Sequence, residues 1–122
     1  MSTSFVQRIR DDSDEIKFYG IEPQITARAV MFELRTKDGK RKAFSYSYVT
    51  EADFEPETGI VIYVSEVVIT IKGRKLDEIF GYFLANRLNY VQEDYSGMDT
   101  EDSSLFVESI EIKPKYPAST AT

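Results

Sequence analysis

Alternation of apolar and polar residues predicts a β-hairpin in the first half of the chain. Apolar residues occupy every second position in residues 28–35 and again in residues 41–48, and Lys37-Asp38-Gly39 lies between the two segments. A period of two is typical of strands with one buried face, and an Asp-Gly pair is a turn signal. The pattern therefore predicts two antiparallel strands joined by a short loop.

The register of this hairpin follows from its apolar side chains. A two-residue Asp-Gly loop would place Phe44 and Tyr46 on the polar face of the partner strand. A three-residue loop, with Gly39 in the left-handed conformation, pairs Phe32 with Phe44 and Val30 with Tyr46. Because a slip of one residue moves every side chain to the other face, the apolar pattern selects the three-residue loop.

A second hairpin is predicted by residues 60–64 and 67–71. A two-residue loop at Ser65-Glu66 pairs Val64 with Val67. The apolar side chains at alternate positions of both strands then lie on one face, so this register is self-consistent.

Apolar residues spaced at i, i+3, i+4, i+7 and i+8 predict one amphipathic helix over residues 74–87. Asp77 and Glu78 lie in its first turn, where the helix dipole favours negative charge. Residues 88–91 predict a short edge strand, and apolar residues between 106 and 112 predict a last strand. The apolar stripe of the helix consists of Leu76, Ile79, Phe80, Phe83 and Leu84.

Together these elements predict an α+β fold, in which a mainly antiparallel curved sheet or partial barrel packs against the helix. The expected organisation is a polar N-terminal segment at residues 1–15, a single domain at residues 16–114 and a disordered tail at residues 115–122. The expected core is Val30, Phe32, Leu34, Phe44, Tyr46, Ile60, Ile62, Val64, Val67, Ile69, Ile71, Leu76, Ile79, Phe80, Phe83 and Leu84.

Composition removes most standard catalytic chemistry. The 122 residues include no Cys and no His, so Ser-His-Asp and Cys-His catalysis, Cys-ligated metals and His-ligated metals are excluded. The acids of residues 53–57 do not have the spacing of a calcium loop, because glycine is seventh instead of sixth. We therefore predict no enzyme, no cofactor and no metal site.

The N-terminus has no apolar run of the kind found in secretory signals, and no segment is apolar over a membrane-spanning length. The expected location is the cytoplasm, with no membrane partner. The chain has 21 acidic and 15 basic residues, a net charge of −6, which argues against general nucleic-acid binding.

The central third of the chain, about residues 44–76, contains Phe44-Ser45-Tyr46-Ser47-Tyr48, Asp53-Phe54-Glu55-Pro56, Gly59-Ile60, and the spaced pattern Val67, Ile69, Ile71, Gly73-Arg74, Leu76. Through these residues the segment resembles a family of short uncharacterised bacterial proteins. The resemblance implies a strand, a bent strand, a hairpin and a helix. It implies no activity, cofactor or functional residue.

Basic residues gather in two turns of this acidic chain, at residues 35–42 and 72–75. If the two turns meet, they form a positive patch that can bind phosphate groups. The candidate anion-binding residues are Lys40, Arg41, Gly73, Arg74 and Lys75. Gly73 is included because free N–H groups at the start of a helix attract anions. The alternative interpretation is that charged turns are simply solvated.

Acidic residues gather between residues 93 and 104. This loop could dock a basic protein partner, as an acidic inhibitor or immunity-type protein does, or it could be a solvated loop. The candidate docking residues are Glu93, Asp94, Asp99, Glu101 and Asp102.

The leading functional prediction is a non-catalytic binding or interaction module with an unknown protein partner or a second copy of itself. The alternatives are a binder of anions, phosphate groups or nucleic acid through the basic turns, and an acidic inhibitor of a basic protein. Strand direction decides whether the two basic turns can share one ligand.

Overall fold

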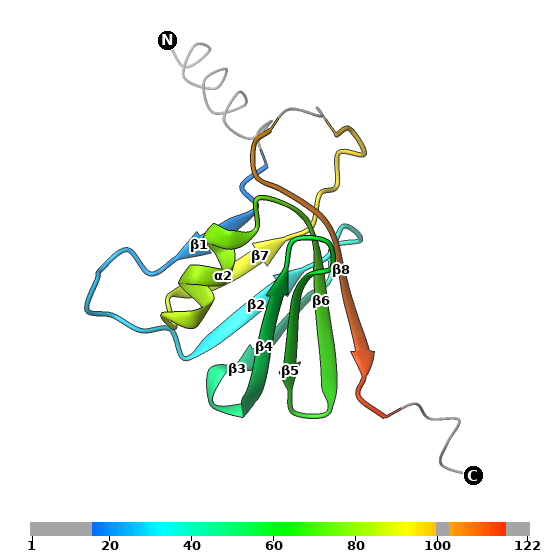
Figure 1. Cartoon of the computed structure of the whole chain (residues 1–122). Helices are drawn as coiled ribbons and strands as arrows, with labels where there is room; N and C mark the ends of the chain where they lie inside the picture. The colour runs from blue at the N-terminus through cyan, green and yellow to red at the C-terminus, as the bar shows by residue number, and fades with distance from the viewer. Residues whose placement is uncertain (1–15, 100–102, 117–122) are drawn as a thin grey trace.

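The computed structural model describes residues 16–99 and 103–116 (Figure 1). The elements follow one another in the order β1 (Tyr19–Ile21), β2 (Met31–Arg35), β3 (Arg41–Ser45), the 3₁₀ turn η1 (Tyr46–Tyr48), β4 (Val49–Glu55), β5 (Gly59–Val64), β6 (Val67–Arg74), α2 (Asp77–Leu84), β7 (Leu88–Gln92) and β8 (Phe106–Pro114).

Two four-stranded sheets share one core. The first sheet has the strand order β1-β7-β2-β3 and the second has the order β4-β5-β6-β8. All neighbouring strands are antiparallel except β2 and β7, which are parallel. The α+β class is confirmed; the two sheets do not close into a barrel, and the partial barrel stays a prediction.

The predicted three-residue loop of the first hairpin is confirmed. Phe32 pairs with Phe44, and Arg35 pairs with Arg41. The Gly39 N–H donates to the Thr36 carbonyl at 3.0 Å, and Gly39 has a φ of 92°, which a side-chain-bearing residue rarely adopts. The glycine therefore sets the register that places polar side chains on the outer face of β2.

The second hairpin also has the predicted register, with Val64 opposite Val67 across Ser65 and Glu66. β3 differs from expectation, because the strand predicted over residues 41–48 ends at Ser45. The Ser45 hydroxyl accepts a hydrogen bond from the Ser47 N–H, and this local contact supports the η1 turn instead of a ladder. The chain then turns into the second sheet.

The helix is shorter than the predicted residues 74–87. β6 continues to Arg74, and Lys75 has a φ of 53°, so helical geometry begins only at Asp77. At the other end Asn86 has a φ of 58° and the Arg87 N–H donates to the Tyr82 carbonyl at 2.9 Å. This is the left-handed C-terminal cap in which asparagine replaces the usual glycine.

Residues 88–91 form the predicted strand, but the prediction that it lies at an edge is wrong. β7 lies between β1 and β2, inside the first sheet. The parallel pairing of β7 with β2 joins segments far apart in sequence, and no local pattern signals it. β7 therefore offers no free edge for pairing between copies.

Two predicted core residues are wrong. Val30 is 77% exposed and Leu84 is 60% exposed, because β2 begins after Val30 and because Leu84 ends the helix on its solvent side. Four further predicted core residues are only partly buried: Phe44, Tyr46, Val67 and Phe80.

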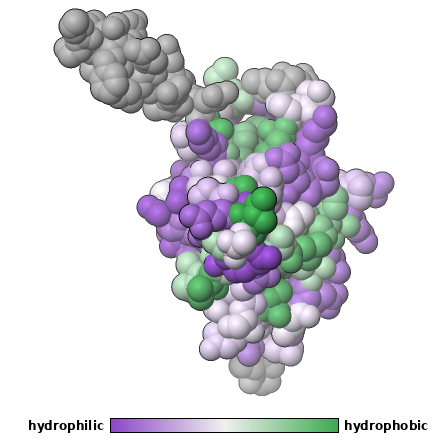
Figure 2. Space-filling view, turned by 90° about the vertical axis from the view of Figure 1, so that its left-hand side faces the viewer, coloured by the Kyte–Doolittle hydropathy of each residue, from purple (hydrophilic) through white to green (hydrophobic). Residues whose placement is uncertain are grey.

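The side of the molecule that carries β1 and α2 shows apolar areas scattered among hydrophilic residues (Figure 2).

The predictions for residues 1–15 and 117–122 lie outside the described residues. Lys115, which was expected in the disordered tail, is described, and its N–H donates to the Glu66 carbonyl at 2.7 Å. Within residues 16–99 and 103–116, no helix combines the length and apolar character needed to cross a membrane.

Candidate functional site

The outer face of the first sheet collects charged and aromatic side chains around β2. Glu33 pairs with Ala43 of β3 and with Tyr90 of β7, while Arg35 pairs with Arg41 and with Gln92. Phe32 and Leu34 point the other way, into the core. The alternation of β2 therefore places Glu33 and Arg35 on the surface beside the side chains of both neighbouring strands.

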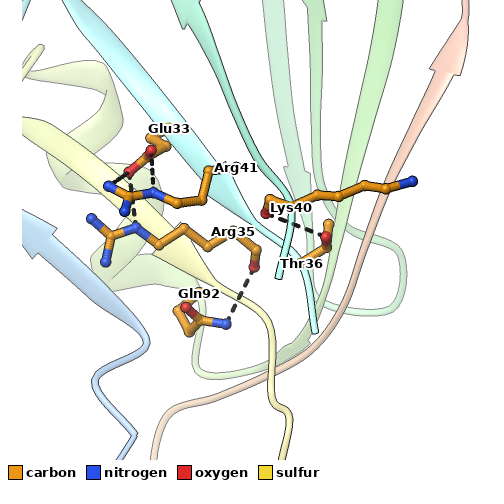
Figure 3. A network of polar contacts seen from close by, with 6 residues as sticks. All are labelled: Glu33, Arg35, Thr36, Lys40, Arg41 and Gln92. Atoms are coloured by element: carbon orange, nitrogen blue, oxygen red, sulfur yellow. Dashed lines mark hydrogen bonds and ion pairs between the residues drawn. The ribbon is translucent and has the colours of Figure 1, made fainter. Parts of the chain in front are cut away.

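Glu33 holds two guanidinium groups in place (Figure 3). The Arg35 Nε donates to Glu33 Oε1 at 2.8 Å, and the Arg41 Nε donates to Glu33 Oε2 at 2.7 Å. Arg35 also stacks on Tyr90, with its guanidinium carbon 3.7 Å from the ring centroid. We call Arg35 and Arg41 the guanidinium pair. Stacking and ion pairing fix its orientation without occupying every donor.

These contacts make the stability contribution of Glu33 depend on pH. Hydrogen bonds from Arg41 and then from Arg35 hold the pKa of the Glu33 carboxyl below its ordinary value of 4.5, against the opposing effect of partial burial. A lowered folded-state pKa stabilises the fold above the unfolded-state pKa, and that stabilisation is lost as pH falls through the folded-state value.

We therefore expect Glu33→Gln to lower the free energy of unfolding by about 1 kcal/mol or less at pH 7. Urea unfolding of both proteins from pH 2 to pH 7 measures the difference. It should shrink as the pH falls below 4.5. A difference that stays constant down to pH 2 would contradict the ion-pair geometry.

A pocket of about 300 Å³ opens beside the guanidinium pair, at the end of the sheet where the hairpin turns. We call it the hairpin pocket. Its lining residues are Arg35, Thr36, Lys37, Gly39, Lys40, Arg41, Gln92 and Tyr95. Within the described part of the chain, the terminal nitrogens of Arg35 have no hydrogen-bond acceptor, so they are available to a ligand.

Hydrogen bonds to backbone carbonyls hold the residues that line the hairpin pocket. The Gln92 side-chain amide donates to the Glu93 carbonyl at 2.8 Å and, more weakly, to the Arg35 carbonyl at 3.4 Å. The Thr36 N–H donates to the Lys40 carbonyl at 2.9 Å. The pocket is therefore built from a closed turn and the end of β7.

Of the candidate residues in this turn, Arg41 belongs to the guanidinium pair, whereas Lys40 points away from it (Figure 3). The Lys40 ammonium lies 3.8 Å from an Asp38 carboxyl oxygen and is well exposed. Lys40 also lines a second pocket, with Glu93 and Ile110, on the other side of the turn. The structure thus separates the charges of two adjacent candidates.

The second basic turn lines a different pocket, of about 570 Å³. Gly73 lies in β6 opposite Val107, not at the start of the helix. A Cβ on Gly73 would lie 1.9 Å from the Phe106 carbonyl oxygen, so close packing explains the glycine. Arg74 donates to Asp99 at 2.8 Å, and Lys75 lies nearby in the same lining.

The two basic turns therefore do not share a described pocket. β8 and the residues after β7 lie between them: Gly73 pairs with Val107, the Asp94 N–H donates to the Val107 carbonyl, and the Glu93 N–H donates to the Arg35 carbonyl. The single-site arrangement of Lys40, Arg41, Arg74 and Lys75 gains no support from this geometry.

Glu93 was predicted to be a docking residue of the acidic loop, and this prediction is wrong. Glu93 is only 6% exposed, and its carboxyl oxygens accept hydrogen bonds from the Lys37 N–H at 2.7 Å and the Ile110 N–H at 3.0 Å. It joins the first hairpin to β8 and cannot dock a partner. Asp94 accepts from Ser96 and Gly97 within its own loop.

Asp99 is engaged by Arg74, and Glu101 and Asp102 lie outside the described residues. The acidic loop is thus partly tied to the fold, and the inhibitor hypothesis rests on the sequence alone.

Sequence reasoning missed Glu33, Gln92, Tyr90 and Tyr95 as parts of the site. Glu33 could have been found from the confirmed register, which places it beside Arg41. The residues of β7 and its following loop could not, because only the parallel pairing with β2 brings them to Arg35.

Comparison with known proteins adds no functional assignment. The chain has no significant match to a protein-family model, to a curated protein or to a solved structure. Its resemblance to short bacterial proteins therefore stays a prediction from the sequence. No group of three or more Asp or Glu residues within residues 16–99 and 103–116 is arranged to hold a metal ion.

Proposed function

We propose that this protein is a non-catalytic binding module whose ligand presents a phosphate or similar oxyanion to the hairpin pocket. The observation that carries the proposal is the guanidinium pair. Glu33 and Tyr90 orient Arg35, while its terminal nitrogens keep free donors beside a pocket of about 300 Å³. A fixed, planar donor fork is the group that binds phosphate and carboxylate with two parallel hydrogen bonds.

Local charge supports the same ligand class. The pocket is lined by Arg35, Lys37, Lys40 and Arg41, and none of its lining residues is acidic. Glu33 balances part of this charge from the same face of the sheet, and the chain as a whole has a net charge of −6. A positive pocket in an acidic protein concentrates anions at that place and repels them elsewhere.

Titration of the purified protein with inorganic pyrophosphate at low ionic strength, followed by calorimetry, tests the proposal. We expect Arg35→Ala and Arg41→Ala to weaken binding by about tenfold or more, because each removes a charged hydrogen bond. Lys40→Ala should have a smaller effect, since the Lys40 ammonium points away from the pair. Added salt should weaken binding further.

Arg28→Ala is the matched control. It removes the same side chain from the loop before β2, where, among the described residues, Arg28 donates only to the neighbouring Ile25 and Ala27 carbonyls. Binding that is lost in Lys75→Ala but kept in Arg35→Ala would transfer the site to the second basic turn and overturn the proposal. So would affinity that is equal in Arg28→Ala and Arg35→Ala.

A further inference from the structure

β3 is a free sheet edge with basic side chains. It pairs with β2 on one side and with no described strand on the other. The Thr36 N–H donates to the Lys40 carbonyl and the Tyr46 N–H donates to the Val30 carbonyl, so even-numbered residues of this strand face β2. By the antiparallel alternation, the backbone groups of Arg41, Ala43 and Ser45 point outward.

β4 is a free edge with acidic side chains. It pairs only with β5 among the described strands. Glu51, Asp53 and Glu55 are exposed and alternate with the partly buried Ala52 and Phe54, so the three acids share the outer face. The Asp53 carboxyl beside it raises the pKa of Glu51, by hydrogen bonding and by charge repulsion. These acids therefore crowd one another, and the charge of Lys115 only partly offsets the repulsion at Glu51.

The side chains at the two edges carry opposite charges. This distinguishes β3 and β4 from sheet edges whose charges only prevent pairing with a second copy. Exposed edges are commonly blunted by charges that repel a second copy. Repulsion requires like charges on the edges that would meet. Here Lys40, Arg41 and Lys42 border one edge, and Glu51, Asp53 and Glu55 border the other, so a second copy is attracted wherever the basic edge meets the acidic one.

We infer that two copies of this chain form a symmetric dimer in which β3 of each copy pairs with β4 of the other. Each copy supplies one basic edge and one acidic edge, so a two-fold axis pairs each β3 edge with a β4 edge, while β1 and β8 remain the outer edges of the two sheets. Strand addition provides backbone hydrogen bonds at Arg41, Ala43 and Ser45, and the opposite charges select the partner edge. This inference does not depend on the anion-binding proposal.

Charge reversal with complementation tests the dimer, by analytical ultracentrifugation at low ionic strength. The basic-edge variant is Lys40→Glu with Lys42→Glu, which leaves the guanidinium pair intact, and the acidic-edge variant is Glu51→Lys with Asp53→Lys. We expect the native chain to sediment as a dimer. We expect each variant alone to raise the dissociation constant by about a hundredfold or more, because like charges then meet at both interfaces.

An equimolar mixture of the two variants should form a heterodimer, since the reversed edges are complementary to each other and the native edges are unchanged. Recovery in the mixture also shows that both variants fold. Ala43→Pro, which removes an outward N–H from an edge strand, should give a monomer, while Ala43→Thr and Arg35→Ala should stay dimeric.

The inference is overturned if the native chain is monomeric at high concentration, if both charge variants remain dimeric, or if their mixture stays monomeric. Loss of pyrophosphate binding in Arg35→Ala, with the dimer unchanged, supports both proposals separately. A dimer whose native form binds no pyrophosphate leaves the dimer standing and removes the anion-binding proposal.

Discussion

Phe32→Ala is expected to lower the free energy of unfolding by about 3–5 kcal/mol. Phe32 is 1% exposed, and its ring lies 5.2 Å from Phe83 in an edge-to-face contact and 5.0 Å from Tyr46. The substitution leaves a cavity where β2, η1 and α2 meet, so neighbouring groups cannot collapse into it without moving an element. This loss is comparable with the whole stability of a small domain.

Chemical unfolding monitored by circular dichroism measures the effect, with Leu84→Ala as the control. Leu84 is 60% exposed on the last turn of the same helix, and its truncation should change stability by about 0.5 kcal/mol or less. Equal losses in the two variants would show that the helix presents a different face to the sheets.

Glu93→Ala is the second substitution with a large expected effect. We expect it to lower the free energy of unfolding by about 2–5 kcal/mol. The carboxyl group accepts from the Lys37 and Ile110 N–H groups, and its removal leaves two backbone donors without their partner. An unsatisfied buried donor costs about 1–3 kcal/mol. The same change also removes the side-chain hydrogen bonds that connect the first hairpin to β8, and these contacts help to hold the hairpin pocket in place.

Glu108→Ala is the matched comparison, because Glu108 is an exposed glutamate on β8. Its unfolding free energy should stay within about 0.5 kcal/mol of the native value. Amide hydrogen exchange measures the effect locally. In Glu93→Ala, the Lys37 and Ile110 amides should exchange faster than in the native protein, and their rates should rise more than those of neighbouring amides. Unchanged exchange at both amides would contradict the buried contact.

Local patterns were enough to predict both hairpins. The alternation around Phe32 and Phe44 and the glycine at position 39 determine one register, and Val64 with Val67 determine the other. These contacts lie close in sequence, where turn chemistry and side-chain period act together. The helix was also found, although its ends depend on the conformations of Lys75 and Asn86, which composition does not reveal.

The pairing of strands far apart in the chain could not be predicted from the sequence. The parallel contact between β2 and β7 moved residues 88–91 from a predicted edge to the inside of a sheet, and it alone brings Gln92 to Arg35. Glu93 resembled its acidic neighbours in the sequence, and only the fold shows that it is buried. The candidate site was therefore predicted as a basic turn, but its geometry required the folded sheet.

The central claim is that the hairpin pocket binds an oxyanion through the guanidinium pair, and nitrogen-15 NMR titration with pyrophosphate tests it most directly. We predict saturable shifts of the Arg35 Nε signal and of the backbone amides of Thr36, Gly39 and Gln92, with the amides of Gly73, Arg74 and Lys75 unchanged. No saturable shift at Arg35, or the largest shifts at residues 73–75, would contradict the account.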